Sequence, residues 1–159
     1  MAKRTVCALL MAVALVLTAC DGSTTPPANE DRELGGLLGN AARASAQGND
    51  LLVLVEVARI PWERAVVFGP YADSTEAERV LGFPWDLSAA SPWVNSEGGH
   101  VLVLADSMGV VSWTTVPSGE VDMYCIAGVV FGRDDAVFES EGDDTSTPVL
   151  MLPDDEACR

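Results

Sequence analysis

The chain has 159 residues, a length that suits one domain of ordinary size. It carries 24 acidic residues against nine basic ones, a net charge of −15, which argues against nucleic acid as a partner because few cations are present to replace the counterions of a phosphate backbone. The single histidine excludes any site that needs two imidazoles.

The first 20 residues have the order of features of a secretory signal. Lys3 and Arg4 form a short positive start, and a mainly apolar stretch follows up to Ala19. This stretch is shorter than the roughly 20 apolar residues that a membrane-spanning helix needs. We therefore predict a signal peptide over residues 1–19.

The end of this segment is Leu17-Thr18-Ala19-Cys20, which resembles the lipobox of bacterial lipoproteins. In that class the cysteine thiol receives a diacylglycerol, and the cysteine becomes the first residue of the mature chain. The resemblance implies lipidation at Cys20 and a lipid-anchored protein on the extracytoplasmic side of the cell membrane, in the periplasm or at the cell surface. The alternative is an ordinary cleaved signal, or an uncleaved anchor, in which the cysteine occurs by chance. The mature chain would keep seven arginines, no lysine and 24 acidic residues, so acyl chains rather than a basic patch would hold it to the membrane.

The stretch after the predicted cleavage site is polar. Asp21–Glu33 contains two prolines and no large apolar residue, which is typical of a flexible tether. We assign residues 20–33 to the lipidated cysteine and this tether, and residues 34–159 to one globular domain.

The domain begins with a predicted helix. The leucines and alanines of Leu34–Gln47 recur at helical spacing, and Gly48 is the expected C-cap. Leu51–Val57 is apolar almost throughout and fits either a buried strand or a continued helix.

The next predicted elements are a strand over Ala65–Phe68 and a helix from Asp73 or Ser74, one of which would cap it, to Leu81. A long loop follows over residues 83–99. The remaining pattern predicts strands over His100–Ala105, Val110–Val116, Ile126–Phe131, Ala136–Glu139 and Thr147–Leu152, with a tight turn at Asp106–Gly109 and the last strand pairing back on the one before it. The fold class is α+β, with a mainly antiparallel sheet and one or two helices.

Trp62–Tyr71, which ends in Phe-Gly-Pro-Tyr, resembles a family of small bacterial lipoproteins with a Trp…Phe-Gly-Pro-Tyr motif and no assigned activity. Further matching pieces run as far as Asp134–Phe138. The resemblance implies a domain type and no catalytic residues. A shaped strand-to-helix corner, with Gly69 in a backbone conformation that a side chain would disfavour, explains the motif, and a ligand-binding loop is the alternative.

Two features of the domain predict specific roles. After lipidation of Cys20, Cys125 and Cys158 are the remaining thiols outside the cytoplasm, and we expect them to form a disulfide. Tyr71, Trp85 and Trp93 are candidates for an aromatic binding surface, with burial of the tryptophans in the core as the alternative.

No catalytic residue, metal ligand or cofactor site is predicted. His100 stands alone and is expected at the surface or rim, and the acidic clusters fit a solvated face better than loose calcium binding. The sequence thus favours a non-catalytic lipoprotein domain that binds an unknown protein or small molecule. The alternative is a cell-envelope hydrolase that uses acidic residues and His100.

Overall fold

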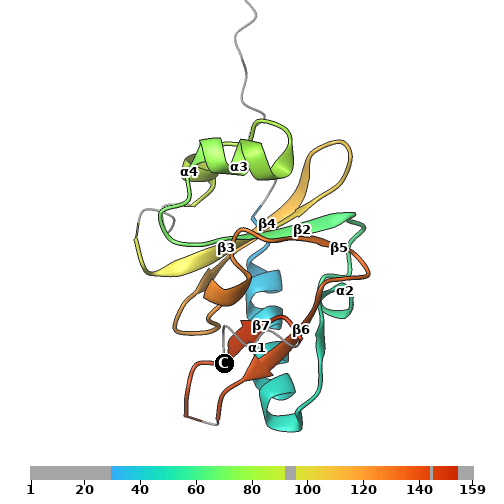
Figure 1. Ribbon diagram of the computed structural model, residues 1–159, viewed down its shortest axis with the longest axis vertical. Coiled ribbons are helices and arrows are strands. Elements are labelled where there is room, and N and C mark those ends of the chain that lie inside the picture. The colour runs from blue at the N-terminus through green and yellow to red at the C-terminus, as the bar shows by residue number, and fades with distance from the viewer. Residues whose placement is uncertain (1–29, 92–95, 144, 154–159) are drawn as a thin grey trace, which may run out of the picture.

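A four-stranded antiparallel sheet lies at the centre of the computed structural model, which describes residues 30–91, 96–143 and 145–153 (Figure 1). Its strand order is β4-β3-β2-β5, with β2 (Arg64–Phe68), β3 (Gly99–Ala105), β4 (Val110–Pro117) and β5 (Val130–Gly132). Every residue of β3 is buried, as is β2 beyond its first residue. Both faces of the sheet are therefore covered.

One face is covered by the long helix α1 (Arg32–Gly48) and by a second antiparallel sheet (Figure 1). That sheet has the order β1-β6-β7, and a single turn of helix, α2, follows β1. The bounds are β1 (Leu52–Val53), α2 (Leu54–Val57), β6 (Val137–Glu141) and β7 (Val149–Met151). Leu38, Leu54 and Phe138 from these elements pack with Leu102 and Leu104 of β3 into the larger of two apolar clusters.

The opposite face is covered by α3 (Ser74–Leu81) and α4 (Leu87–Ala90). Here Leu81 and Trp85 pack on Phe68, Val101 and Val103, which belong to the second apolar cluster. Side chains alternate along a strand, so neighbouring residues of β3 enter different clusters.

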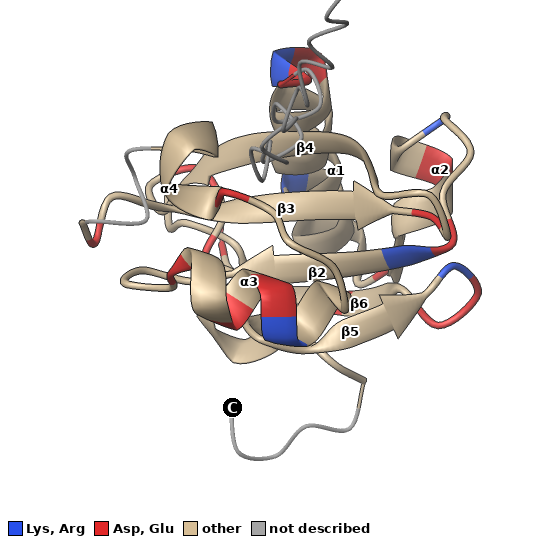
Figure 2. Ribbon diagram, turned by 90° about the horizontal axis from the view of Figure 1, so that it is seen from above, with Lys and Arg blue, Asp and Glu red and all other residues tan. Residues whose placement is uncertain are grey.

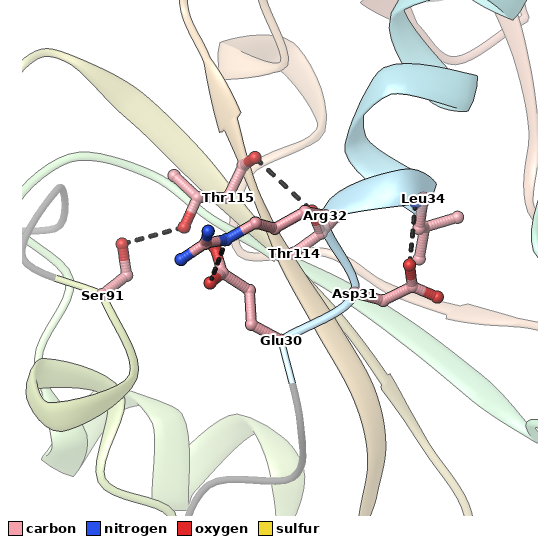
Figure 3. A network of polar contacts seen from close by, with 7 residues as sticks. All are labelled: Glu30, Asp31, Arg32, Leu34, Ser91, Thr114 and Thr115. Carbon is pink, nitrogen blue, oxygen red and sulfur yellow. Dashed lines mark hydrogen bonds and ion pairs between the residues drawn. The ribbon is translucent and has the colours of Figure 1, made fainter.

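The chain joins the domain along the outer edge of β4. Glu30 forms a bridge with Trp113, and the backbone N–H of Asp31 donates to the carbonyl oxygen of Trp113 at 2.8 Å. The Asp31 carboxylate then accepts from the N–H of Leu34 at 3.0 Å and caps α1 (Figure 3). These contacts fix the position of the helix on the sheet.

The α+β class and the antiparallel sheets are confirmed, as are the helix that ends at Leu81 and the hairpin of β3 and β4. Asp73 caps α3, and β7 pairs back on β6 as predicted. Residues 51–57 form both alternatives in turn, a two-residue strand and then one helical turn.

Three local predictions are wrong. The C-cap of α1 is Asn49, in a left-handed conformation, rather than Gly48. Ile126–Phe131 is not one strand, because it begins in the 3-10 helix η2 (Tyr124–Ile126) and Gly128, at φ 77°, separates that turn from β5. The loop over residues 83–99 contains α4, which begins where the Asp86 carboxylate accepts from the N–H of Ala89.

The predicted signal peptide, Cys20, most of the tether, Trp93 and Cys158 lie outside the described residues. In the part of the chain that is described, no helix combines the length and the apolar character needed to cross a bilayer.

Two neighbouring glycines of α1 give a test of this packing. A Cβ at Gly35 would lie 2.8 Å from Oγ1 of Thr114 and 3.2 Å from the carbonyl oxygen of Thr115, whereas a Cβ at Gly36 would meet nothing within 4 Å. We expect Gly35→Ala to lower the free energy of unfolding by about 1–3 kcal/mol, because the helix must move away from β4. Gly36→Ala should raise it by about 0.5–1 kcal/mol through helix propensity. Urea unfolding of both variants checks this, and shifts of the same sign would contradict the close packing.

Candidate functional site

A groove of about 470 Å³ runs between α1 and the segment that follows α2. Its volume falls within the roughly 300–1,000 Å³ that is usual for ligand pockets. The apolar lining residues are Leu34, Leu37, Ala41, Val57, Ala58 and Ile60, and the charged ones are Asp31, Glu33, Glu56 and Arg59.

One wall of the groove is formed by an apolar stripe along α1. The core covers only part of this stripe. Leu34, Leu37 and Ala41 recur three and four residues apart and so lie along one side of α1. Leu34 is buried, but 44% of Leu37 remains exposed. The stripe therefore continues from the core onto the surface.

The opposite wall is held in place by Arg133, which is distant in the sequence. Its Nη1 donates to the carbonyl oxygens of Ile60 and Trp62 at 3.3 and 3.2 Å, and its guanidinium lies 5.3 Å from the ring centroid of Trp62. At the other end of this segment, the N–H of Leu54 donates to the carbonyl oxygen of Ala136 at 2.9 Å. Because its backbone is anchored at both ends, this wall is a preformed surface.

The rim of the groove is mainly acidic. Glu33 comes from the first turn of α1 and Glu56 from α2, so one carboxylate stands on each wall. Both are exposed, and neither takes part in an ion pair within the described ranges. Arg59 is the one basic residue among the lining residues. Figure 2 shows the same excess of acidic over basic positions across the helices and turns of the domain.

Figure 3 shows the network of polar contacts at the start of α1, and two of its residues, Asp31 and Leu34, line this groove. The guanidinium of Arg32 pairs with the Glu30 carboxylate at 2.9 Å, and Asp31 caps the helix. Behind the helix start, the hydroxyls of Ser91 and Thr115 lie 3.0 Å apart. Within the described residues, the carboxylate of Glu33, also in the first turn of α1, takes part in no ion pair and caps no backbone group.

The structure does not bring Tyr71 and Trp85, two residues of the predicted aromatic surface, together on one exposed surface. Tyr71 is 67% exposed and its hydroxyl donates to Oε1 of Glu97 at 3.5 Å. Trp85 is only 4% exposed, with ring centroids of Phe68 and Trp113 at 6.4 and 6.3 Å, so this side chain belongs to the core, as the alternative had it. Trp93 lies outside the described residues.

The Phe-Gly-Pro-Tyr corner differs from the expectation in one respect. The residue in the left-handed region is Tyr71, at φ 67°, rather than Gly69. A Cβ at Gly69 would instead lie 3.4 Å from the Cβ of Ala127, so the glycine permits close approach of a neighbouring segment.

His100 is buried, and its predicted position at the surface or rim is wrong. Only 2% of the residue is exposed, because β3 begins at Gly99 and His100 already pairs with Val116 of β4. Neither ring nitrogen has a hydrogen-bond partner within the described residues, and the nearest carboxylate, Oδ1 of Asp122, lies 4.0 Å from Nε2. Burial lowers the pKa of His100, and Asp122 opposes this shift.

The acidic clusters organise local structure where they are described. The Asp143 carboxylate accepts from the backbone and hydroxyl of Thr145 and from the backbone of Ser146, and these hydrogen bonds hold its pKa at about 2. No group of three or more His, Cys, Asp or Glu side chains that could hold a metal ion occurs among the described residues.

The groove was not anticipated from the sequence, although part of its signal is present there. The spacing of Leu34, Leu37 and Ala41 marks one wall. The other wall depends on Arg133, whose contact with residues 60–62 spans more than 70 residues and leaves no local pattern.

No protein-family model, curated protein or solved structure matches this chain in comparisons with known proteins. The predicted lipobox that ends at Cys20 and the resemblance at Trp62–Tyr71 rest on the sequence motifs alone. The groove, the predicted anchor and the charge of the chain are the features that bear on function.

The buried histidine predicts a pH-dependent stability. The pKa of His100 in the folded state lies below its ordinary value of 6.5, so the unfolded chain binds more protons and stability falls as the pH drops below about 6.5. One proton contributes a slope of at most about 1.4 kcal/mol per pH unit. Urea unfolding between pH 7.5 and 5.5 should show this loss in the wild type and a weaker dependence in His100→Gln. Equal slopes in the two proteins would contradict the prediction.

The pairing of Cys125 with Cys158 gives a second test. The expected disulfide between Cys125 and Cys158 stays a prediction, because Cys158 lies outside the described residues. Peptide mapping without reductant should recover the segments around Cys125 and Cys158 as one linked species. Loss of the bond in Cys158→Ser should lower the free energy of unfolding by about 3–4 kcal/mol, because it releases a loop of intermediate length. Alkylation of Cys158 in the native, unreduced protein would refute this pairing.

Proposed function

We propose that this chain is a lipid-anchored, extracytoplasmic binding domain, held to the cell membrane through a diacylglycerol on Cys20. The observation that carries the proposal is the order of a positive start at Lys3 and Arg4, a short apolar stretch, and Leu17-Thr18-Ala19-Cys20. The domain then acts by contact with a partner outside the cytoplasm, and the acidic groove beside α1 is its contact surface.

The position of the first described residues supports this arrangement. Cys20 and Glu30 are ten residues apart, so the chain between them reaches at most about 35 Å when extended. Glu30 and Asp31 are fixed on β4, and Asp31 also lines the groove. An anchor at Cys20 would therefore keep the groove within a short distance of the membrane.

The charge of the mature chain favours a protein partner over the lipid surface. Removal of residues 1–19 takes away Lys3 and Arg4, which leaves a side-chain charge near −17. A domain of this charge is repelled by anionic headgroups and attracts positively charged molecules. The lipid would then supply the membrane attachment and the domain the recognition.

Lipidation is tested by metabolic labelling with an alkyne analogue of palmitate in a bacterial host that processes lipoproteins. We expect label on the wild-type chain and none on Cys20→Ala, because the thioether and the new amino terminus both form at this residue. Cys7→Ala is the matched control and should keep the label, since Cys7 lies within the predicted signal peptide. Label that persists in Cys20→Ala, or its absence from the wild type, would overturn the proposed function.

A further inference from the structure

We propose that the groove between α1 and residues 56–60 binds a segment of a partner protein in which one or two large apolar side chains are flanked by Lys or Arg. This inference rests on the proposed binding function and names the chemistry of its partner. It follows from three properties of the groove. These are its apolar lining, the carboxylates that line it from α1 and from α2, and the hydrogen bonds that hold its walls in place.

The apolar residues that line the groove favour an apolar side chain of the partner. Leu37 stands 44% exposed beside Ala41, Val57 and Ile60, which are only partly buried and pack against the main core. Covering such surface yields about 25 cal/mol for each Å² removed from water. A segment that places leucine-like side chains here would extend the core outward from Leu34.

The acidic residues of the rim favour basic residues on both sides of that apolar side chain. Glu33 and Glu56 stand on opposite walls, and neither is neutralised by an ion pair within the described residues. A peptide lying between the walls has neighbours on either side of its apolar anchor, and Lys or Arg at those places meets a carboxylate. Asp31 adds a third carboxylate, so the lining is acidic overall even though it includes Arg59.

The negative charge of the mature chain favours a protein segment over an anionic lipid surface as the partner. The mature chain, with a charge near −17, repels anionic headgroups but accelerates the approach of a basic segment. The walls need no rearrangement to receive it, because Asp31 caps α1 and Arg133 fixes residues 60–62.

The proposal is tested with three dye-labelled hexapeptides and the full chain as the cell processes it. The chain is held in phosphatidylcholine nanodiscs if it carries the lipid, with empty nanodiscs as the reference, and in buffer if it does not. The probes are Lys-Lys-Leu-Leu-Lys-Lys, the same peptide with Ser in place of Leu, and the same peptide with Glu in place of Lys. We expect fluorescence anisotropy to detect the first peptide and at least a fivefold weaker affinity for the other two. Equal binding of all three, or no binding of the first, would overturn the proposal.

Matched variants locate the binding. Leu37→Ser and the double variant Glu33→Gln, Glu56→Gln should each weaken the first peptide at least fivefold. Their controls are Met108→Ser, at a residue that is 91% exposed in the turn between β3 and β4, and Glu78→Gln, at an exposed carboxylate on α3. Controls that weaken binding as much as the groove variants would show that diffuse charge attracts the peptide, and this would refute the groove as the site.

The two proposals fail in different ways. Palmitate label on Cys20 without peptide binding overturns the groove assignment and leaves the lipid anchor standing. Peptide binding that depends on Leu37 and the two glutamates, but without label on Cys20, overturns the proposed anchor and leaves the groove as the binding site.

Discussion

Burial of the two central strands on both faces is the constraint on which the rest of the structure depends. β2 and β3 consist largely of Val, Leu and Ala, and their side chains alternate between two apolar clusters. A sheet with apolar side chains on both faces must have both faces covered by other elements. α3 and α4 therefore cover one face, and α1 with the three-stranded sheet covers the other (Figure 1).

The cover supplied by α1 has consequences for the surface. The helix approaches β4 closely at Gly35, and the Glu30–Asp31 segment pairs with Trp113 at the edge of the same strand. This placement buries Leu34 but turns Leu37 toward solvent, and Arg133 holds the facing segment through the carbonyl oxygens of Ile60 and Trp62. The groove thus results from the way in which α1 and residues 56–60 close the core, and three of its four charged lining residues are acidic.

Local signals predicted the elements that have their causes within a few residues. The caps at Asp73 and Gly82 bound α3, and the turn at Asp106–Gly109 joins β3 to β4 because the Asp106 carboxylate accepts from the N–H groups of Met108 and Gly109. Sequence reasoning failed where the cause is distant. His100 follows a glycine pair and therefore resembles a residue at the edge of a loop, but it lies in β3, paired with Val116 of β4, and is buried.

The sequence by itself determined the α+β class, the main helices, the hairpin, the acidity of the domain and the motif at Cys20 on which the predicted anchor rests, because each follows from composition or from spacing within one segment. Only the tertiary structure decided that Trp85 joins the core while Tyr71 stays exposed, that His100 is buried, and that Glu33 and Glu56 line the same groove. These outcomes depend on which side of each element the central sheet needs covered, and on contacts such as that of Arg133 with residue 60, which no short segment encodes.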